Sequence, residues 1–153
     1  MAAFRPTATW ETLRARARLL TRVRGFFDER DFCEVQTPVL SRDTVIDRHL
    51  DPISLQLPAD GFGASPQQMW LQTSPEFAMK RLLASGGNSI YQLGPAFRLG
   101  EAGAHHNPEF TLLEWYRVGD GLQEGIQLLG QFVSAMLGGT YQVRTFREVC
   151  LEY

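Results

Sequence analysis

The chain has 153 residues, of which 44% are hydrophobic and 21% charged, and its formal net charge is −2. This length fits one globular domain, and the near-neutral charge gives no electrostatic sign of nucleic-acid binding. No stretch reaches the ~18 apolar residues of a membrane span, and the N-terminus lacks the apolar segment of a signal peptide, so we expect a cytoplasmic protein without membrane contact. The two cysteines, Cys33 and Cys150, lack the spacing of a disulfide framework or a metal site and are expected as reduced thiols.

A first helix is predicted from about residue 10, with Thr9 as its N-cap and Glu11 in its first turn. Its apolar stripe, at three- and four-residue steps, consists of Leu13, Ala17, Leu20, Val23 and Phe27. The arginines on the other face suit a solvated surface, although such a helix could also pack in a dimer.

A short strand is predicted over residues 32–40, and Pro38 ends or edges it because proline cannot donate to a strand ladder. Residues 41–68 follow as loops and edge strands, since prolines and glycines punctuate them repeatedly. This is the part of the chain where the pattern is weakest.

A second helix is predicted over about residues 75–85. Ser74 takes the N-cap, Pro75 the first helical position, and glycines follow at the exit. Glu76 has a structural explanation, because a carboxylate in the first turn complements the helix dipole by ~0.3–1 kcal/mol. A role in ligand binding stays open beside it.

Two strands, ending near Arg98 and beginning near Glu109, are predicted to form an antiparallel hairpin with a long tip, and long ordered loops tend to be functional. Alternation on the second strand places on one face Phe110, Leu112, Glu114 and Tyr116. On the preceding strand one parity holds Gln92, Gly94, Ala96 and Arg98. The small side chains at two of these positions leave space near Arg98, which is typical of a pocket floor.

Glu114 is the unusual residue of the hairpin, because an ionised carboxylate in an apolar strand costs several kcal/mol to bury unless a cation meets it. That cation could be Arg98, Arg117 or the ammonium group of a ligand. An internal salt bridge and a ligand site therefore both remain open.

Other motifs are weak or absent. His105 and His106 are adjacent on a loop and have no third ligand at a recognisable spacing, so we expect no metal site, and neither common glycine-rich phosphate cradle occurs.

A third helix is predicted to start with a capping box of Asp120 and Gln123. Its expected core stripe comprises Leu122, Ile126, Leu129, Val133 and Met136. Residues 141–146 are predicted as a strand, and the first turns of a helix follow.

Two segments, TSPEFAMKRLL (residues 73–83) and FRLGEAGAHHNPEFTLLEWY (residues 97–116), resemble the catalytic domain of class II aminoacyl-tRNA synthetases of the lysyl type. Within that family the resemblance is strongest to the ligases that attach lysine or β-lysine to a lysine of elongation factor P. It runs from about residue 10 to the end and includes a motif-1-like helix and strand over residues 16–40. It implies an α+β fold, an incomplete class II core with an antiparallel sheet flanked by helices, and a homodimer.

The resemblance also implies residue roles for ATP. Arg98 would be the catalytic residue, binding the α-phosphate of ATP and the substrate carboxylate. Phe110 would stack on adenine. The loop positions expected on the nucleotide are Leu99, Gly100, His106 and Asn107.

For the amino acid, the resemblance implies that Ser74, Pro75 and Glu76 line the site, with Glu76 taking the α-amino group. Glu114 and Tyr116 would receive the side-chain ammonium. Lysine or β-lysine would be activated with ATP and Mg²⁺ and passed to elongation factor P, with tRNA a less expected acceptor.

Two departures from the family pattern matter. Gly100 stands where the family's motif 2 has a Glu that meets adenine, so recognition would shift to Glu101 or weaken. The glycine-rich motif 3 and the acidic Mg²⁺ ligands are not found in residues 1–153, nor is an anticodon-binding domain. We therefore expect an N-terminal portion of the catalytic domain with little activity alone. The alternatives are a piece of a lysyl-tRNA synthetase or a non-catalytic paralogue that dimerises.

Overall fold

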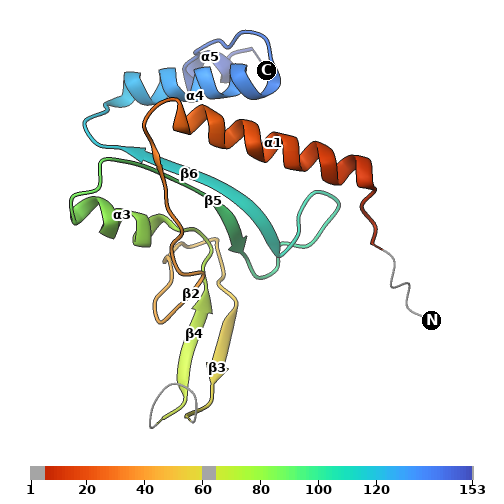
Figure 1. The fold of residues 1–153 in the computed structure, drawn as a ribbon, viewed down its shortest axis with the longest axis vertical. Helices are drawn as coiled ribbons and strands as arrows, with labels where there is room; N and C mark the ends of the chain where they lie inside the picture. The colour runs from red at the N-terminus through yellow and green to blue at the C-terminus, as the bar shows by residue number, and fades with distance from the viewer. Residues whose placement is uncertain (1–5, 60–64, 153) are drawn as a thin grey trace. The chain divides into compact units, whose positions relative to one another are not determined.

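The computed structural model describes residues 6–59 and 65–152. The chain divides into two compact units, one formed by residues 1–31 with 119–153 and the other by residues 32–118. The segments before residue 32 and after residue 118 thus form one unit together (Figure 1), and the portion of a single catalytic domain expected over residues 1–153 stays a prediction.

The unit of residues 32–118 is built on a long antiparallel hairpin, β5 (Ser89–Phe97) with β6 (Glu109–Arg117), as predicted. A third strand, β1 (Cys33–Glu34), pairs with β5 in the parallel direction, and the sheet order is β1-β5-β6. The α+β class is confirmed; the expected antiparallel pairing holds for β5 and β6, whereas β1 makes this sheet mixed.

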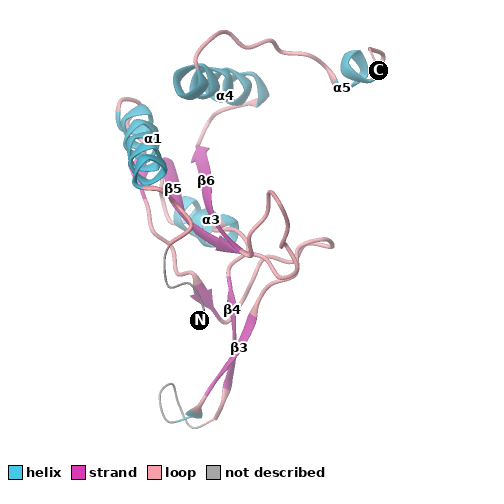
Figure 2. Cartoon of the chain, turned by 90° about the vertical axis from the view of Figure 1, so that its right-hand side faces the viewer, coloured by secondary structure: helices cyan, strands magenta, loops and turns pink. Residues whose placement is uncertain are grey.

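A second, antiparallel sheet of order β2-β4-β3 joins β2 (Leu40–Ser41), β4 (Gln67–Leu71) and β3 (Ser54–Leu57). The paired β3 and β4 extend away from the hairpin in both views of the chain (Figures 1 and 2). The predicted strand over residues 32–40 is thus two short strands in different sheets. Backbone pairing with β5 ends at Val35, whose N–H donates to the Tyr91 carbonyl at 2.8 Å, and the N–H of Thr37 donates instead to the Gln92 side chain at 2.9 Å.

The helix α3 (Glu76–Ala84) begins one residue later than predicted, with Pro75 at the N-cap. The Ser74 hydroxyl still accepts from the Glu76 N–H at 3.1 Å, which is the capping contact expected of it. Met79 of this helix is fully buried, and so is Tyr91 of β5. After the C-cap at Ser85, Gly86 takes a φ of 107°, a conformation that favours glycine.

The other unit contains α1 (Trp10–Asp28), α4 (Leu122–Leu137) and α5 (Phe146–Cys150). As predicted, the Thr9 side chain caps α1 by accepting from the Thr12 N–H at 3.2 Å. Phe26 of α1 and Phe132 of α4 pack edge to face with 5.3 Å between ring centroids. None of the helices that the structure describes is long and apolar enough to cross a bilayer.

Both predicted stripes of this unit need correction. In α1 only the C-terminal half is buried, and Leu13 remains 42% exposed. In α4 the buried positions are Leu128 and Gly130, whereas Leu129 is 48% exposed. The helix meets α1 through Phe132, so its contact face is rotated from the predicted stripe.

Two further predictions in this unit are wrong. The N-cap of α4 is Gly121, whose N–H donates to the Glu124 carboxylate at 3.0 Å, and not Asp120. Residues 141–145 form no strand. The Tyr141 ring instead lies against α4, where a Cβ added to Gly130 would come within 2.3 Å of it.

Candidate active site

The register of the hairpin gathers the candidate site residues on one face. Across the two strands Gln92 lies opposite Glu114, Gly94 opposite Leu112 and Ala96 opposite Phe110. Directly opposed residues of an antiparallel pair project to the same side of the sheet. The predicted sharing of one face is therefore confirmed for these strand residues.

At one end of this face a carboxylate is held by two hydroxyl groups, and we call Ser74, Glu76, Glu114 and Tyr116 the acidic end. The Ser74 hydroxyl donates to Glu114 Oε2 at 2.7 Å, and the Tyr116 hydroxyl donates to Glu114 Oε1 at 2.5 Å. Because Ser74 also accepts from the Glu76 N–H, it joins the start of α3 to β6.

The protonation of Tyr116 is fixed by its surroundings. Burial of the phenol raises its pKa well above the usual value, and the hydrogen bond to Glu114 and the negative charges of Glu114 and Glu76 raise it further. Tyr116 therefore stays a hydrogen-bond donor to Glu114 at neutral pH.

The internal salt bridge considered for Glu114 is not formed within residues 6–59 and 65–152, since no cationic side chain there pairs with it. Glu76, in contrast, accepts from Lys80 Nζ at 2.5 Å. This pair was not foreseen, although four-residue spacing on a helix is a sufficient sequence signal for it. The acidic end thus brings two carboxylates close together and supplies one ammonium group of its own.

At the other end of the face lies the guanidinium of Arg98. Its Cζ lies 4.9 Å from the centre of the Phe110 ring, and Nη1 lies 3.5 Å from Glu101 Oε1. Arg98 Nε is buried and has no hydrogen-bond partner among residues 6–59 and 65–152. We call Arg98, Glu101 and Phe110 the guanidinium end; it is less fully hydrogen-bonded than the acidic end.

The remaining predicted site residues belong to neither the acidic end nor the guanidinium end. Pro75 is buried at the start of α3. Leu99 is 59% exposed, and its N–H donates to the Asp51 carbonyl at 2.8 Å. The other predicted loop residues are exposed: Gly100, His106 and Asn107.

One buried residue near the site was not predicted to bind anything. Gln92 is 5% exposed, and its Oε1 accepts from both the N–H and the hydroxyl of Thr37 at 2.9 Å. The pair attaches residues 35–38 to the floor of the site beside Glu114. Sequence could not reveal it, because the two residues lie 55 positions apart.

The side chains that could bind a metal ion do not cluster in the described residues. Within the described ranges no group of three or more His, Cys, Asp or Glu side chains could hold a metal ion. These residues therefore do not fit a Mg²⁺ site, and we assign no step to Mg²⁺ through them.

Comparison with known proteins identifies relatives. The chain is 44% identical over 149 residues to the elongation factor P–(R)-β-lysine ligase of Vibrio vulnificus (strain YJ016), covering 97% of this chain and 46% of the relative. The ligase of the same name from Vibrio campbellii is 52% identical over 116 residues, which is 76% of this chain and 36% of the relative. That of Pseudoalteromonas translucida is 54% identical over 114 residues, or 74% and 35%.

The chain spans less than half the length of the curated relatives it matches. The family model for class II tRNA synthetases (D, K and N) matches residues 1–145, which include both ends of the site. The chain belongs to the class II tRNA synthetase family.

Proposed function

We propose that this chain carries the amino-acid and ATP site of a ligase that activates lysine or β-lysine and transfers it to a lysine of elongation factor P. The observation that carries the proposal is the carboxylate of Glu114 and the guanidinium of Arg98 along the hairpin face, with a second carboxylate, Glu76 of α3, whose charge acts on Tyr116. A diamino acid has the complementary charges, two ammonium groups and one carboxylate.

The acidic end would bind the two amino groups. Glu114 is oriented by the hydroxyls of Ser74 and Tyr116, and each carboxylate oxygen keeps a further lone pair for an ammonium group of the ligand. Glu76 would take the second amino group, in exchange for the exposed contact with Lys80. An exposed ion pair of this kind contributes only about 0.2–1 kcal/mol, so a ligand can displace it.

The guanidinium end would bind the nucleotide and the substrate carboxylate. The face of the Phe110 ring offers a stacking surface for adenine, and Arg98 offers donors to a phosphate oxygen. The exposed loop residues Leu99, Gly100, His106 and Asn107 would complete the nucleotide site, together with a Glu101 released from its contact with Arg98.

In the first step a carboxylate oxygen of the amino acid attacks the α-phosphorus of ATP, the bond to the bridging oxygen breaks, and pyrophosphate leaves. Arg98 stabilises the charge that develops on the phosphoryl oxygens, and no protein nucleophile is needed. In the second step the neutral amine of the acceptor lysine attacks the acyl carbon and an amide bond forms. The bond from that carbon to the phosphate oxygen breaks, AMP leaves with its electron pair, and the amine nitrogen releases a proton to solvent.

The proposal also includes the setting of the enzyme. Two copies would pair through the motif-1-like segment of residues 16–40. The exposed, unpaired thiols of Cys33 and Cys150 agree with a reducing cytoplasm.

Calorimetry tests the binding half of the proposal. Lysine titrated into the chain with a non-hydrolysable ATP analogue should give saturable heat, and alanine should not. Equal or absent heats for the two amino acids would contradict the proposal.

Turnover is tested in a chimaera that joins the chain to the remaining part of the Vibrio vulnificus relative. It should show lysine-dependent exchange of pyrophosphate into ATP and should label elongation factor P. Labelling of tRNA in place of elongation factor P would favour the lysyl-tRNA synthetase alternative.

A further inference from the structure

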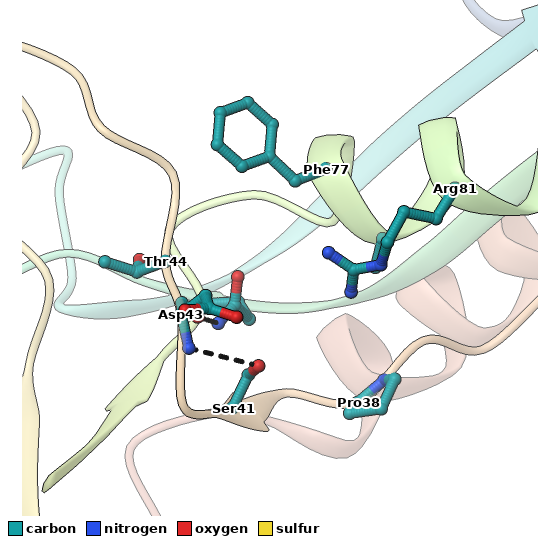
Figure 3. Close-up of a pocket in the computed structure, with 8 residues that line it drawn as sticks. Pro38, Ser41, Asp43, Thr44, Phe77 and Arg81 are labelled. Atoms are coloured by element: carbon teal, nitrogen blue, oxygen red, sulfur yellow. Dashed lines mark hydrogen bonds between the residues drawn. The ribbon is translucent and has the colours of Figure 1, made fainter. Parts of the chain in front are cut away.

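A second hollow lies on the side of α3 that does not carry Glu76. It is a cavity of about 30 Å³ lined by α3 and by the segment around β2. In Figure 3 the Arg81 side chain extends from α3 toward the segment that carries Ser41, Asp43 and Thr44, and Phe77 lies on the same helix. No residue of the acidic or guanidinium end lines this hollow.

Hydrogen-bonding groups in the cavity are left without partners. The Thr44 hydroxyl is buried and has no hydrogen-bond partner in the part of the chain that the structure describes. Gln72 is 9% exposed; its Nε2 donates to the Asp43 carbonyl at 2.6 Å, so its Oε1 remains free among the described residues. Within residues 6–59 and 65–152 no hydrogen bond or ion pair engages the Arg81 guanidinium or the Asp43 carboxylate. Asp43 and Arg81 are exposed, so their side chains are available to a ligand. Buried polar groups are normally paired, so the buried Thr44 hydroxyl is the group whose missing partner a ligand would supply.

A wider open groove continues from the cavity. Its volume is about 580 Å³, and it shares Asp43, Thr44, Phe77 and Arg81 with the cavity. The additional lining residues are Arg42, Ile46 and Trp70. Ile46 is 90% exposed and Phe77 is 42% exposed. The groove therefore combines an apolar floor with two arginines.

The mixture of donors and acceptors selects the kind of ligand. A lone anion would suit Arg81 but would meet the Asp43 carboxylate and the free Gln72 Oε1 at the same site. A peptide group suits both sides, because its C=O accepts from a guanidinium and its N–H donates to an amide or carboxylate oxygen. The cavity has room for about one such polar group.

We propose that this groove docks an extended segment of the acceptor protein. A backbone amide of that segment lies in the cavity between Arg81 and Gln72. An acidic side chain of the segment lies near Arg42, and an apolar side chain packs against Phe77, Trp70 and Ile46. The proposal rests on the proposed function for the identity of the partner. Phe77 of the groove directly follows Glu76 in α3. Because Glu76 would hold an amino group of the amino acid that is to be transferred, a partner in the groove would be bound beside the substrate site.

The test is binding of elongation factor P from Vibrio vulnificus to the chain, measured by biolayer interferometry without ATP or lysine. Arg81→Glu should raise the Kd at least about tenfold, because it removes a donor and repels an acidic segment. Ile46→Asp should have a similar effect, and its side chain is too exposed to be needed for folding. The matched control is Arg14→Glu, the same change of charge on an exposed arginine of α1 outside the motif-1-like segment, which should leave the Kd within about twofold.

Unchanged affinity in both groove variants, or no binding by the unsubstituted chain, would overturn the proposal. A loss of dimer in Arg81→Glu by light scattering, with elongation factor P binding intact, would also overturn it, since the groove would then be a contact between copies. Lysine binding, measured by calorimetry, tests the proposed function independently of the groove. Its absence in the unsubstituted chain would contradict the proposed function, whereas a fall in elongation factor P affinity confined to the groove variants would support the groove.

Discussion

The two ends of the hairpin face differ in how completely the protein satisfies them. Both oxygens of Glu114 accept hydrogen bonds from hydroxyl groups at 2.7 Å or less. Arg98, by contrast, leaves a buried Nε unpaired, and its contact with Glu101 is long at 3.5 Å. A carboxylate fixed in advance suits recognition of one ammonium group, whereas a guanidinium with free donors suits a ligand that brings its own oxygens.

The largest effect is expected at the acidic end. Glu114→Gln removes the charge that would meet the ligand ammonium and should weaken lysine binding by about 2–5 kcal/mol, so that lysine-dependent exchange in the chimaera falls below detection. Glu109→Gln, at an exposed position at the start of β6, is the control and should exchange normally. Near-normal exchange by Glu114→Gln would remove Glu114 from the proposed role.

Arg98→Ala should cost about 2.7–4 kcal/mol of transition-state stabilisation, by analogy with the removal of a donor to a developing oxyanion. The change should appear in the kcat of pyrophosphate exchange. Lysine binding without nucleotide should change less than in Glu114→Gln. If Arg98→Ala alters only lysine binding and leaves kcat unchanged, Arg98 does not stabilise the transition state as proposed.

Tyr116→Phe removes one hydrogen bond to a charged acceptor and should raise the Kd for lysine about tenfold, since such bonds contribute about 1.5–3 kcal/mol. Because the folded pKa of Tyr116 is raised, stability from its protonated phenol is fully present below about pH 10 and is lost as the pH rises toward the folded pKa. Absorbance at 295 nm should therefore not differ between the two proteins near pH 10. A phenolate signal missing from Tyr116→Phe at that pH would show that the phenol is not shielded.

The smallest effect is expected for Glu101→Gln. The ion pair with Arg98 is long and partly exposed, so its loss should change lysine-dependent exchange by less than about fivefold. A change above tenfold in the KM for ATP would instead show that Glu101 contacts the nucleotide directly.

Sequence patterns predicted the hairpin because alternation with a period of two fixes which side chains share a face, and they predicted the start of α3 because Ser74 and Pro75 act locally. They could not reveal the bond from Ser74 to Glu114, which joins residues 40 positions apart. The strand expected at residues 141–146 failed for a tertiary reason: the Tyr141 ring packs on Gly130, a contact that no local propensity encodes.

Discrimination between lysine and norleucine tests the acidic end most directly, because norleucine has the same chain length without the side-chain ammonium. We predict that the chain binds lysine at least about 30-fold more tightly than norleucine, and that Glu114→Gln removes most of this preference while norleucine binding changes little. A Glu114→Gln protein that keeps the full preference for lysine would contradict the assignment of Glu114 as the ammonium receptor.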